Sequence, residues 1–139
     1  MNVTSRTISF HAAVDEIKDI TPLVARELAE TGLSDGTVTI FVPGATGAIS
    51  TVEYEPGLVE TDIHEALDRL APKRAHYAHN DRWHDGNGYS HVRATVLGPS
   101  LVVPFIDGDL VLGTWQQLIF LNLDNRARTR EVVLQFIGK

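Results

Sequence analysis

One short segment, from Tyr77 to His91, concentrates the side chains whose types and spacing could do chemistry. It contains three of the chain's six histidines, His79, His84 and His91. Between these histidines lie Asp81, Asp85 and Asn87. No apolar period runs through the first part of the segment, so we expect a loop rather than a core element. Imidazoles and carboxylates crowded onto a glycine-containing loop are suited to metal binding or to proton transfer.

Two interpretations of the histidines stay open. Neutral imidazoles bind Zn²⁺ and similar ions, which often take three protein ligands and keep one position free. Gly86 and Gly88 would let the chain fold back between His79 and His91, so a three-ligand site that also includes His84 is geometrically reasonable. The alternative is a set of solvated loop histidines, since neither the HxxxH spacing of a helix nor the HxH spacing of a strand is present.

Two carboxylates upstream are further candidates, Glu53 and Asp62. A carboxylate close to a histidine can act as a general base or hold the imidazole in one tautomer. Both residues also have a structural explanation. Asp62 falls near the start of a predicted helix, where the helix dipole favours acidic side chains, and Glu53 suits an exposed strand position.

Two glycine-containing stretches could contribute to a binding site. The stretch Gly44-Ala-Thr-Gly47 contains Thr46, and its backbone N–H groups could hold an anion such as phosphate. No lysine follows as in a Walker sequence, and a structural turn is the alternative. In Gly113-Thr-Trp-Gln116, Trp115 could stack on a ligand and Gln116 could hydrogen-bond it. A core tryptophan beside a β-bulge explains that stretch equally well.

Three arginines alternate near the end of the chain, Arg126, Arg128 and Arg130. On an extended chain they point to one side, so they could bind a phosphate or carboxylate or form ion pairs across a subunit contact. Solvated surface charge is the default for such a run.

Length and composition indicate a single globular domain over residues 1–139. The apolar fraction of 43% allows a core of useful size. Cysteine is absent, which excludes disulfides, thiolate nucleophiles and Cys-ligated metal centres. The net charge of -6 argues against a general nucleic-acid surface. We find neither a signal-peptide core nor the roughly 18 apolar residues of a membrane span, so we expect a cytosolic protein without nucleic-acid or membrane partners.

Apolar periods and end signals predict three helices: Thr21–Thr31, Leu58 to the residue before Pro72, and a short one over Gly88–Leu97. In the first helix, Thr21 could cap the start, Pro22 suits the first position and Gly32 suits the C-terminal cap. Asp15–Asp19 is polar and predicts a turn.

Alternating or β-branched runs predict strands over residues 4–12, 36–42, 49–54, 100–105, 110–112, 113–121 and 130–137. Helices are interleaved with strands early in the chain, and strands dominate its last forty residues. We therefore expect an α+β fold, in which a mixed β-sheet packs with two to three helices in one domain.

The stretch Leu97–Leu118 carries the most specific resemblance to a known family. Its Gly-Pro-Ser, Pro, Gly and Gly-Thr-Trp-Gln elements resemble the signature of the YjbQ-like proteins, small single-domain chains often described as secondary thiamine-phosphate synthases. Upstream, Tyr77-Ala-His79 and Ser90-His91 match a Tyr-x-His and a downstream His of the family. At the end, Asp124–Gly138 matches its arginine-rich closing strand, so the resemblance runs nearly from end to end.

The resemblance implies an α+β subunit that forms homotrimers, with a polar pocket near the subunit interface. It implies that His79 and His91 act there as catalytic groups or metal ligands, with Asp62 as the orienting or basic carboxylate. The candidate substrate-binding residues are Thr46, Glu53, Asn87, Trp115 and Gln116. It also implies a weak thiamine-phosphate synthase activity, in which a pyrimidine methyl diphosphate joins a thiazole phosphate. A divalent metal, zinc or magnesium, would neutralise the diphosphate that leaves.

One departure from the family pattern concerns Gly44. Many members carry a His-Thr-Ser-Ala run followed by an Asn-Glu pair, whereas here Gly44 replaces the histidine and Val52 replaces the asparagine. The extra His84, with the neighbouring Asp85, could compensate as a third metal ligand beside His79 and His91.

The leading interpretation is a small cytosolic transferase-like enzyme that acts on a small phosphorylated or heterocyclic substrate. A ligand-binding or metal-binding protein without turnover is one alternative, and the missing histidine at Gly44 favours it. A structural or interaction module is the other.

Overall fold

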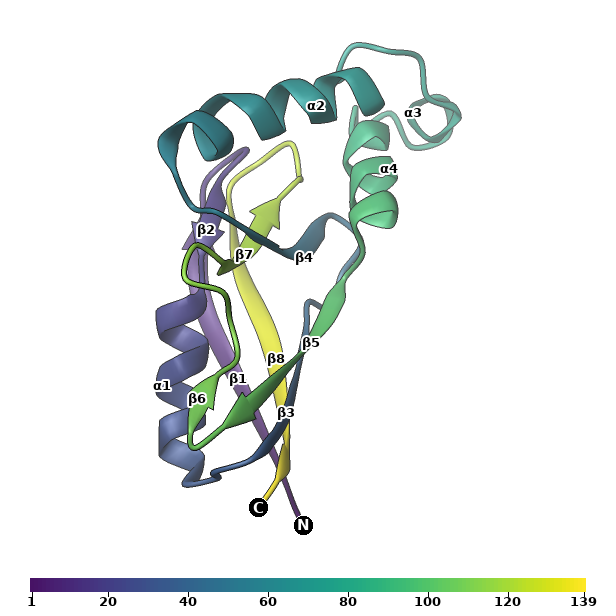
Figure 1. Ribbon diagram of the computed structural model, residues 1–139. Helices are drawn as coiled ribbons and strands as arrows, with labels where there is room; N and C mark the ends of the chain where they lie inside the picture. The colour runs from purple at the N-terminus through teal and green to yellow at the C-terminus, as the bar shows by residue number, and fades with distance from the viewer.

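Two antiparallel β-sheets, four α-helices and one π-helical turn make up the fold (Figure 1), and the computed structural model describes every residue from Met1 to Lys139. The strands are β1 (Asn2–Ala12), β2 (Ile17–Asp19), β3 (Gly36–Phe41), β4 (Gly47–Val52), β5 (Ser100–Ile106), β6 (Asp109–Leu110), β7 (Gln117–Asn122) and β8 (Arg128–Gly138). The helices are α1 (Thr21–Thr31), the π-helical turn η1 (Gly57–Asp62), α2 (Ile63–Leu70), α3 (Ala78–Trp83) and α4 (Gly88–Leu97).

The larger sheet has the strand order β1-β8-β3-β5-β6. β1 and β8 pair over all eleven residues of β1, starting with Asn2 opposite Gly138, so the two chain ends lie side by side (Figure 1). Gly36 of β3 is also opposite Gly138. A Cβ on Gly36 would come 2.1 Å from the carbonyl oxygen of Ile137, so the close approach of β3 and β8 requires glycine here.

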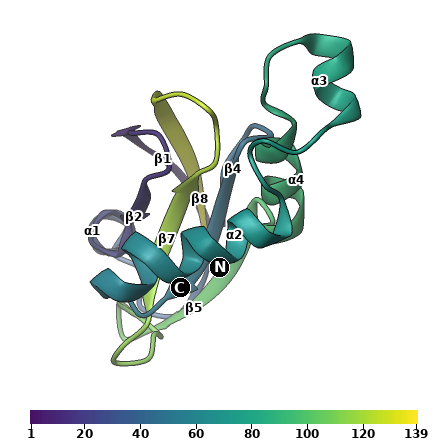
Figure 2. The ribbon, with the colours of Figure 1, turned by 90° about the horizontal axis from the view of Figure 1, so that it is seen from above.

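The smaller sheet, with the order β2-β7-β4, lies between two hydrophobic cores. Leu118 and Phe120 of β7 belong to the larger core, which α1 and the five-stranded sheet enclose. Ile119 and Leu121 belong to a second core with residues of α2 and α4, the helices on the other side of this sheet (Figure 2). Successive side chains of a strand point to opposite faces, so β7 has an unbroken apolar run because both of its faces are covered.

α1 confirms the predicted helix, with Pro22 in its first turn and Gly32 in the left-handed region at φ 71° after its last turn. The predicted cap is wrong. The helix starts after Ile20 without a side-chain cap, because Thr21 Oγ1 instead accepts a hydrogen bond of 2.8 Å from the backbone N–H of Leu118. That bond ties the start of α1 to β7.

The helix predicted from Leu58 is present as η1 followed by α2, and it ends at Leu70, close to Pro72. Its apolar side chains Val59, Ile63 and Leu67 pack on the second core, as their spacing predicts. The π-helical start is a local widening of the helix that sequence periodicity does not reveal.

The segment between Pro72 and α4 is not wholly a loop as predicted. Residues Ala78–Trp83 form α3, which projects away from both sheets (Figures 1 and 2), and His84 ends it at φ 54°. α3 is only six residues long, and none of them is buried, so no apolar period could identify it. α4 confirms the short helix predicted over Gly88–Leu97.

The α+β class is confirmed, and some details differ from the sequence prediction. All strand pairings are antiparallel rather than mixed. Ile17–Asp19, predicted to be a turn, pairs with β7 as β2, whereas Gly113–Gln116 lies outside the strands. No helix in the fold has both the length and the apolar character that crossing a membrane requires.

Candidate functional site

A polar pocket with a volume of about 430 Å³ opens where β4 begins and β7 ends. Gly47 pairs with Asn122, so the loop before β4 and the loop after β7 emerge at the same end of the small sheet. The residues around the start of α4 complete the wall. The lining is Ala45 and Thr46 from the first loop, Asp124, Asn125, Arg126 and Arg128 from the second, and Asp85, Asn87 and His91 near α4.

Asp124 is the buried carboxylate of this pocket, with 2% of its surface exposed. Its Oδ2 accepts hydrogen bonds from Thr46 Oγ1 at 2.9 Å and from Arg128 Nη1 at 3.0 Å. Its Oδ1 has one long contact, 3.5 Å from Asn87 Nδ2. Burial by itself would raise the pKa of Asp124, but the two short hydrogen bonds and the charges of Arg128 and Arg130 outweigh burial and lower this pKa. The carboxylate is therefore ionised at neutral pH.

Arg130 lies beneath the loop before β4 and is 5% exposed. Its Nη2 donates to the carbonyl and hydroxyl oxygens of Thr46, both at 3.1 Å, and to Asn122 Oδ1 at 2.6 Å. Burial, followed by the charge of Arg128, lowers the pKa of Arg130, although Asp124 opposes this shift. Arg130 thus fastens Thr46 to β7 and holds its hydroxyl against Asp124.

The loop before β4 depends on a glycine at position 44. Gly44 has a φ of +119°, a region that residues with a side chain rarely adopt. The only atom within 4 Å of a Cβ placed there is Arg130 Nη1, at 4.0 Å, so conformation rather than lack of space disfavours a side chain. A histidine at this position would need a different loop backbone, so Gly44 changes the shape of the loop as well as its chemistry.

Asn87 precedes α4 and joins the lining segments. Its Oδ1 accepts a hydrogen bond of 3.2 Å from the backbone N–H of Asn125 and another from the Ser90 hydroxyl. Its own N–H donates to Asp85 Oδ1 at 3.0 Å, and Asn125 Nδ2 donates to the Asp85 carbonyl at 2.9 Å. Because α4 starts directly after Asn87, the positive end of the helix dipole lies at the pocket wall.

His79 of α3 and His91 of α4 lie side by side, with ring centroids 4.6 Å apart and ring planes at 42°. The Nδ1 atom of His79 is buried and has no hydrogen-bond partner. Asp85 Oδ1 lies 3.4 Å from this nitrogen, but the contact does not satisfy hydrogen-bond geometry. A buried ring nitrogen without a hydrogen-bond partner is uncommon in folded proteins and is a feature expected of functional groups.

His84 is not part of this pair, because it ends α3 in the left-handed region and its side chain is exposed. The structure holds no group of three or more His, Asp or Glu side chains arranged to bind a metal ion. The predicted arrangement of His79, His84 and His91 is therefore not formed, and metal binding stays a prediction. The side chains that a divalent ion would meet here are His79 and His91, with Asp85 beside them.

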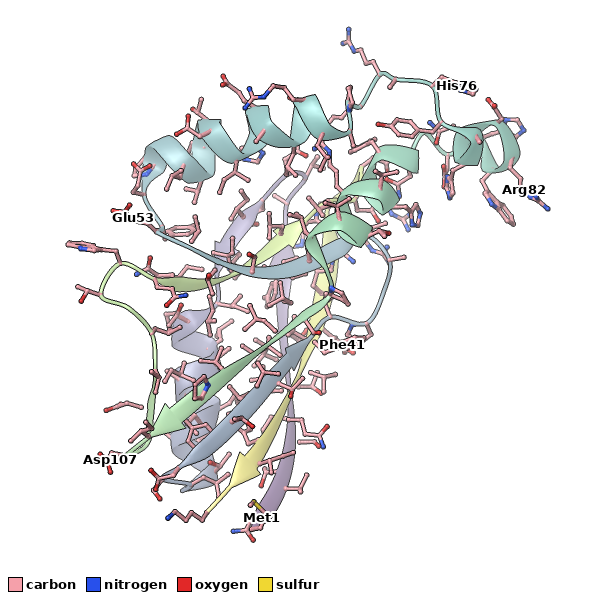
Figure 3. All side chains as sticks on the ribbon, turned by 45° about the vertical axis from the view of Figure 1, so that its right-hand side comes forward. Met1, Phe41, Glu53, His76, Arg82 and Asp107 are labelled. Carbon is pink, nitrogen blue, oxygen red and sulfur yellow. The ribbon has the colours of Figure 1, made fainter.

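Other predicted site residues lie at the far end of the small sheet. β4 and β7 run antiparallel for five residue steps, or about 17 Å, between the pocket and the pair of Val52 with Gln117. Glu53 follows that end of β4, and Trp115 and Gln116 precede that end of β7. Figure 3 shows Glu53 on the opposite side of the molecule from the labelled residues around α3.

Trp115 has 72% of its surface exposed, so it is not a core residue. Gln116 Oε1 accepts a hydrogen bond of 3.0 Å from the Gly113 N–H, and Gln116 Nε2 donates to Thr51 Oγ1 at 3.3 Å. Asp62 is exposed at the junction of η1 and α2. Within one chain, these residues do not join the pocket that contains His91, and their roles stay predictions.

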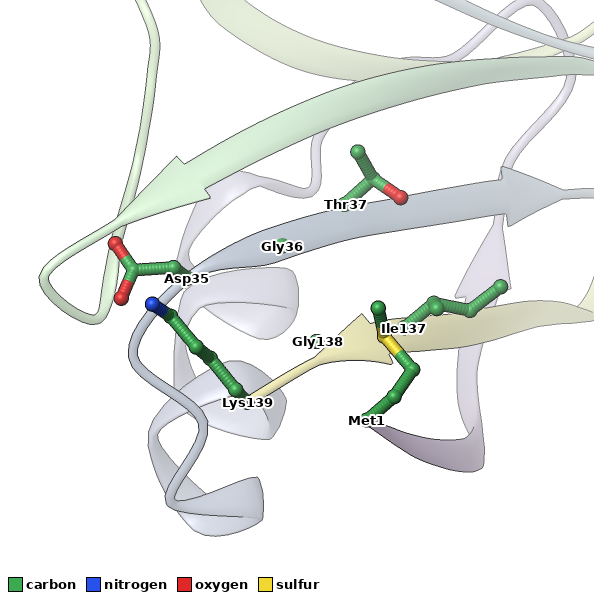
Figure 4. A pocket seen from close by; sticks show the side chains of 7 residues that line it. All are labelled: Met1, Asp35, Gly36, Thr37, Ile137, Gly138 and Lys139. Atoms are coloured by element: carbon green, nitrogen blue, oxygen red, sulfur yellow. The ribbon is translucent and has the colours of Figure 1, made fainter.

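A larger cavity, of about 490 Å³, lies beside the chain ends (Figure 4). Its wall includes the strand glycines Gly36 and Gly138, and its only ionisable side chains are those of Asp35 and Lys139. No histidine and no network of buried polar groups lines it. We therefore take the smaller, polar pocket that His91 lines as the candidate functional site.

Sequence reasoning missed Asp124 and Asn125 as site residues. Asp and Asn are ordinary turn residues, so nothing local distinguishes them from the rest of a connecting loop. The alternating arginines were the usable signal, because Arg126 and Arg128 line the pocket and Arg130 lies beneath it.

Known proteins resemble this chain over nearly its whole length. The family model described as UPF0047 protein YjbQ-like matches residues 6–139. A UPF0047 protein of Archaeoglobus fulgidus is 43% identical over 120 residues, which cover 86% of this chain and 90% of the relative. The UPF0047 protein YugU of Bacillus subtilis is 34% identical over 125 residues, which cover 89% and 91%.

Solved structures agree with these sequence matches. A YbjQ-like protein of unknown function from Sulfolobus solfataricus superposes with a TM-score of 0.88 at 30% identity, covering 99% of this chain and all of the other. A hypothetical protein from Aeropyrum pernix gives a TM-score of 0.85 at 34% identity, covering 96% of this chain and 99% of the other. The chain therefore belongs to the YjbQ-like (UPF0047) family.

Proposed function

We propose that the pocket beside His79 and His91 is the active site of a small cytosolic enzyme that acts on a small phosphorylated substrate. The observation that carries this proposal is the buried, unpartnered Nδ1 of His79, whose ring centroid lies 4.6 Å from that of His91, a residue that lines the pocket together with Arg126 and Arg128. Unsatisfied polar groups that converge on a concave surface are typical of ligand sites.

Two features support a phosphoryl group as part of the ligand. Arg126 and Arg128 lie in the same wall, and guanidinium groups bind phosphate oxygens through paired N–H donors. Arg128 is already paired with Asp124, whereas Arg126 is exposed. The start of α4 adds the partial positive charge of the helix dipole near the same wall, although the backbone N–H groups of Asn87 and Gly88 already donate to Asp85 and Asn80.

The chemistry that the family resemblance implies fits these groups. In a thiamine-phosphate synthase reaction, the ring nitrogen of a thiazole phosphate attacks the methylene carbon of a pyrimidine methyl diphosphate. The carbon–oxygen bond breaks, and its electron pair leaves with the diphosphate. Hydrogen bonds from His91 and from Arg126 would stabilise the charge that develops on this leaving group. A divalent ion bound by His79 and His91 would supply the same stabilisation.

Turnover by purified protein tests this proposal. With the two thiamine precursors as substrates, we expect formation of thiamine phosphate together with release of diphosphate. His91→Ala should lower the rate by about 100-fold or more, because it removes a group that stabilises the leaving diphosphate. His76→Ala is the matched control, since this histidine directly precedes the segment (Figure 3), is exposed and is paired with Asp81. Equal rates for wild type and His91→Ala would contradict the proposal.

A binding protein without turnover is the second candidate, and the loop at Gly44 favours it. That loop brings no ionisable side chain to the pocket, so proton transfer from its side would depend on water. Saturable binding of inorganic diphosphate that weakens in Arg126→Gln, with no product formed from the precursors, would support this alternative over the enzyme.

We also propose a homotrimer that forms through the outer face of the five-stranded sheet. This face carries exposed apolar side chains: Val3, Phe41, Val102, Ile106 and Ile137. Several exposed apolar side chains on one face are typical of a protein–protein contact.

The mass of the particle in solution tests the trimer. We expect native mass spectrometry to give three chains for the wild type and one chain for Val102→Lys. Val14→Lys is the control, because Val14 is exposed in the turn after β1, away from this face. A monomeric wild type would rule out the trimer and leave the pocket proposal standing.

A further inference from the structure

We propose that Asp124 Oδ1 recognises a cationic or N–H-bearing part of the ligand, so that the pocket takes a bipolar molecule, a phosphate ester that also carries an ammonium or amino group. This inference rests on the proposed phosphoryl site and adds a second, opposite point of recognition to it.

The two carboxylate oxygens of Asp124 differ in the hydrogen bonds that they accept. Oδ2 has two short hydrogen bonds, from Thr46 at 2.9 Å and Arg128 at 3.0 Å, whereas Oδ1 has only the 3.5 Å contact with Asn87. A carboxylate offers about four lone-pair sites, and a buried one normally uses them, because an unsatisfied buried charge is costly. Asp124 lines the pocket, so Oδ1 has capacity for a donor that enters there.

The position of this carboxylate is held on several sides. Thr46 is itself fastened by Arg130, and Arg128 extends from the strand that follows the Asp124 loop. Asn87 is held by Asn125 and by the start of α4. Asp124 therefore cannot turn to satisfy Oδ1 elsewhere without breaking these bonds. A rigid acceptor of this kind suits recognition of a ligand.

The anionic and cationic walls of the pocket adjoin each other. Arg128 Nη1 lies 3.0 Å from one oxygen of Asp124, and Arg126 lines the pocket from the same loop. Because Asp124 already engages Arg128, the exposed Arg126 is the guanidinium left to meet a phosphate. A ligand whose opposite charges are a few bonds apart would satisfy Arg126 and Asp124 together.

A pair of matched probes tests this inference: O-phosphoethanolamine and ethyl phosphate, titrated into the wild type near pH 8, where both phosphates carry nearly two charges. Only the first carries an ammonium group. We expect the wild type to bind O-phosphoethanolamine at least about tenfold more tightly, as a charge-assisted hydrogen bond predicts. Asp124→Asn should bind both probes equally, and its retained binding of ethyl phosphate would show that the pocket is intact.

The outcomes separate this inference from the proposed function. Equal binding of the two probes by the wild type overturns the role of Asp124 and leaves the phosphoryl site standing. Absence of binding by either probe overturns both. If Asp124→Asn does not fold, the test uses the wild type alone. The ¹³C chemical shift of the Asp124 carboxyl group is then followed as each probe is added. That signal should move with O-phosphoethanolamine and not with ethyl phosphate, and an equal response to both would refute the proposal.

Discussion

The imidazoles of His79 and His91 lie 4.6 Å apart between ring centroids, although they belong to different helices. Gly86, at φ +64°, lies between the helices where the chain turns back. At the first position of α4, Gly88 packs so closely on α3 that a Cβ would come 2.6 Å from the Cβ of Tyr77. The pair is thus produced by the contact between the two helices rather than by the sequence spacing of the histidines.

Zinc titration distinguishes the members of the histidine segment. We expect His79→Ala and His91→Ala each to weaken Zn²⁺ binding by about tenfold or more, because each removes one imidazole of the pair. His84→Ala should leave the affinity unchanged, since its side chain is exposed at the end of α3. Isothermal titration of chelator-treated protein gives the affinities. A loss in His84→Ala as large as that in His91→Ala would show that His84 is a ligand after all.

Gly88→Ala should loosen the contact between α3 and α4. The added methyl group would press on Tyr77 and come 3.0 Å from Asn80 Oδ1, the atom that accepts a hydrogen bond from the Gly88 N–H. We expect a loss of about 1–3 kcal/mol, as overpacking produces, and faster hydrogen exchange in α3 than in the β-sheets. Ala78→Ser, at an exposed position of α3, is the control. Unchanged exchange in α3 would contradict the inferred packing.

Arg130→Met should destabilise the fold. It leaves the Thr46 carbonyl and Asn122 Oδ1 without the donor that Arg130 provides in the buried interior. We expect the free energy of unfolding, measured in urea, to fall by about 3 kcal/mol. Arg26→Met on the exposed side of α1 should change it by less than about 0.5 kcal/mol. Similar losses for the two variants would show that the buried guanidinium has no special role.

The stability of the protein should depend on the ionisation of Asp124. Its pKa in the folded protein lies below the ordinary value of 3.8, so an unfolded chain takes up the proton first as the pH falls. The stabilisation is therefore fully present above this ordinary value and is lost as the pH falls through the folded pKa. Urea unfolding of wild type and Asp124→Asn between pH 6 and pH 3 should show a stability difference that narrows with acid. A difference independent of pH would mean that the carboxylate charge does not stabilise the fold.

Local sequence signals were sufficient to predict most of the helices and strands. α1 could be predicted with both ends because Pro22 and Gly32 restrict the backbone directly, and the apolar period of α2 reflects a face that must be buried. His79 and His91 could be chosen over His84 because they match the family pattern. α3 could not be predicted, since a six-residue polar helix has neither a buried face nor a cap signal.

Tertiary structure decided which residues lie together at the candidate site. The pattern of β7 shows that both of its faces are buried, but it does not specify which residue of β4 lies opposite Asn122. Strand register is a non-local property, set by the packing of whole faces and by the loops between them. That register brings Thr46 to Asp124 and leaves Trp115 about 17 Å away at the other end of the strands. The sequence by itself determined the class of the fold and made two histidines candidates for the site, whereas strand pairing determined which residues lie near them, because register depends on contacts between distant segments.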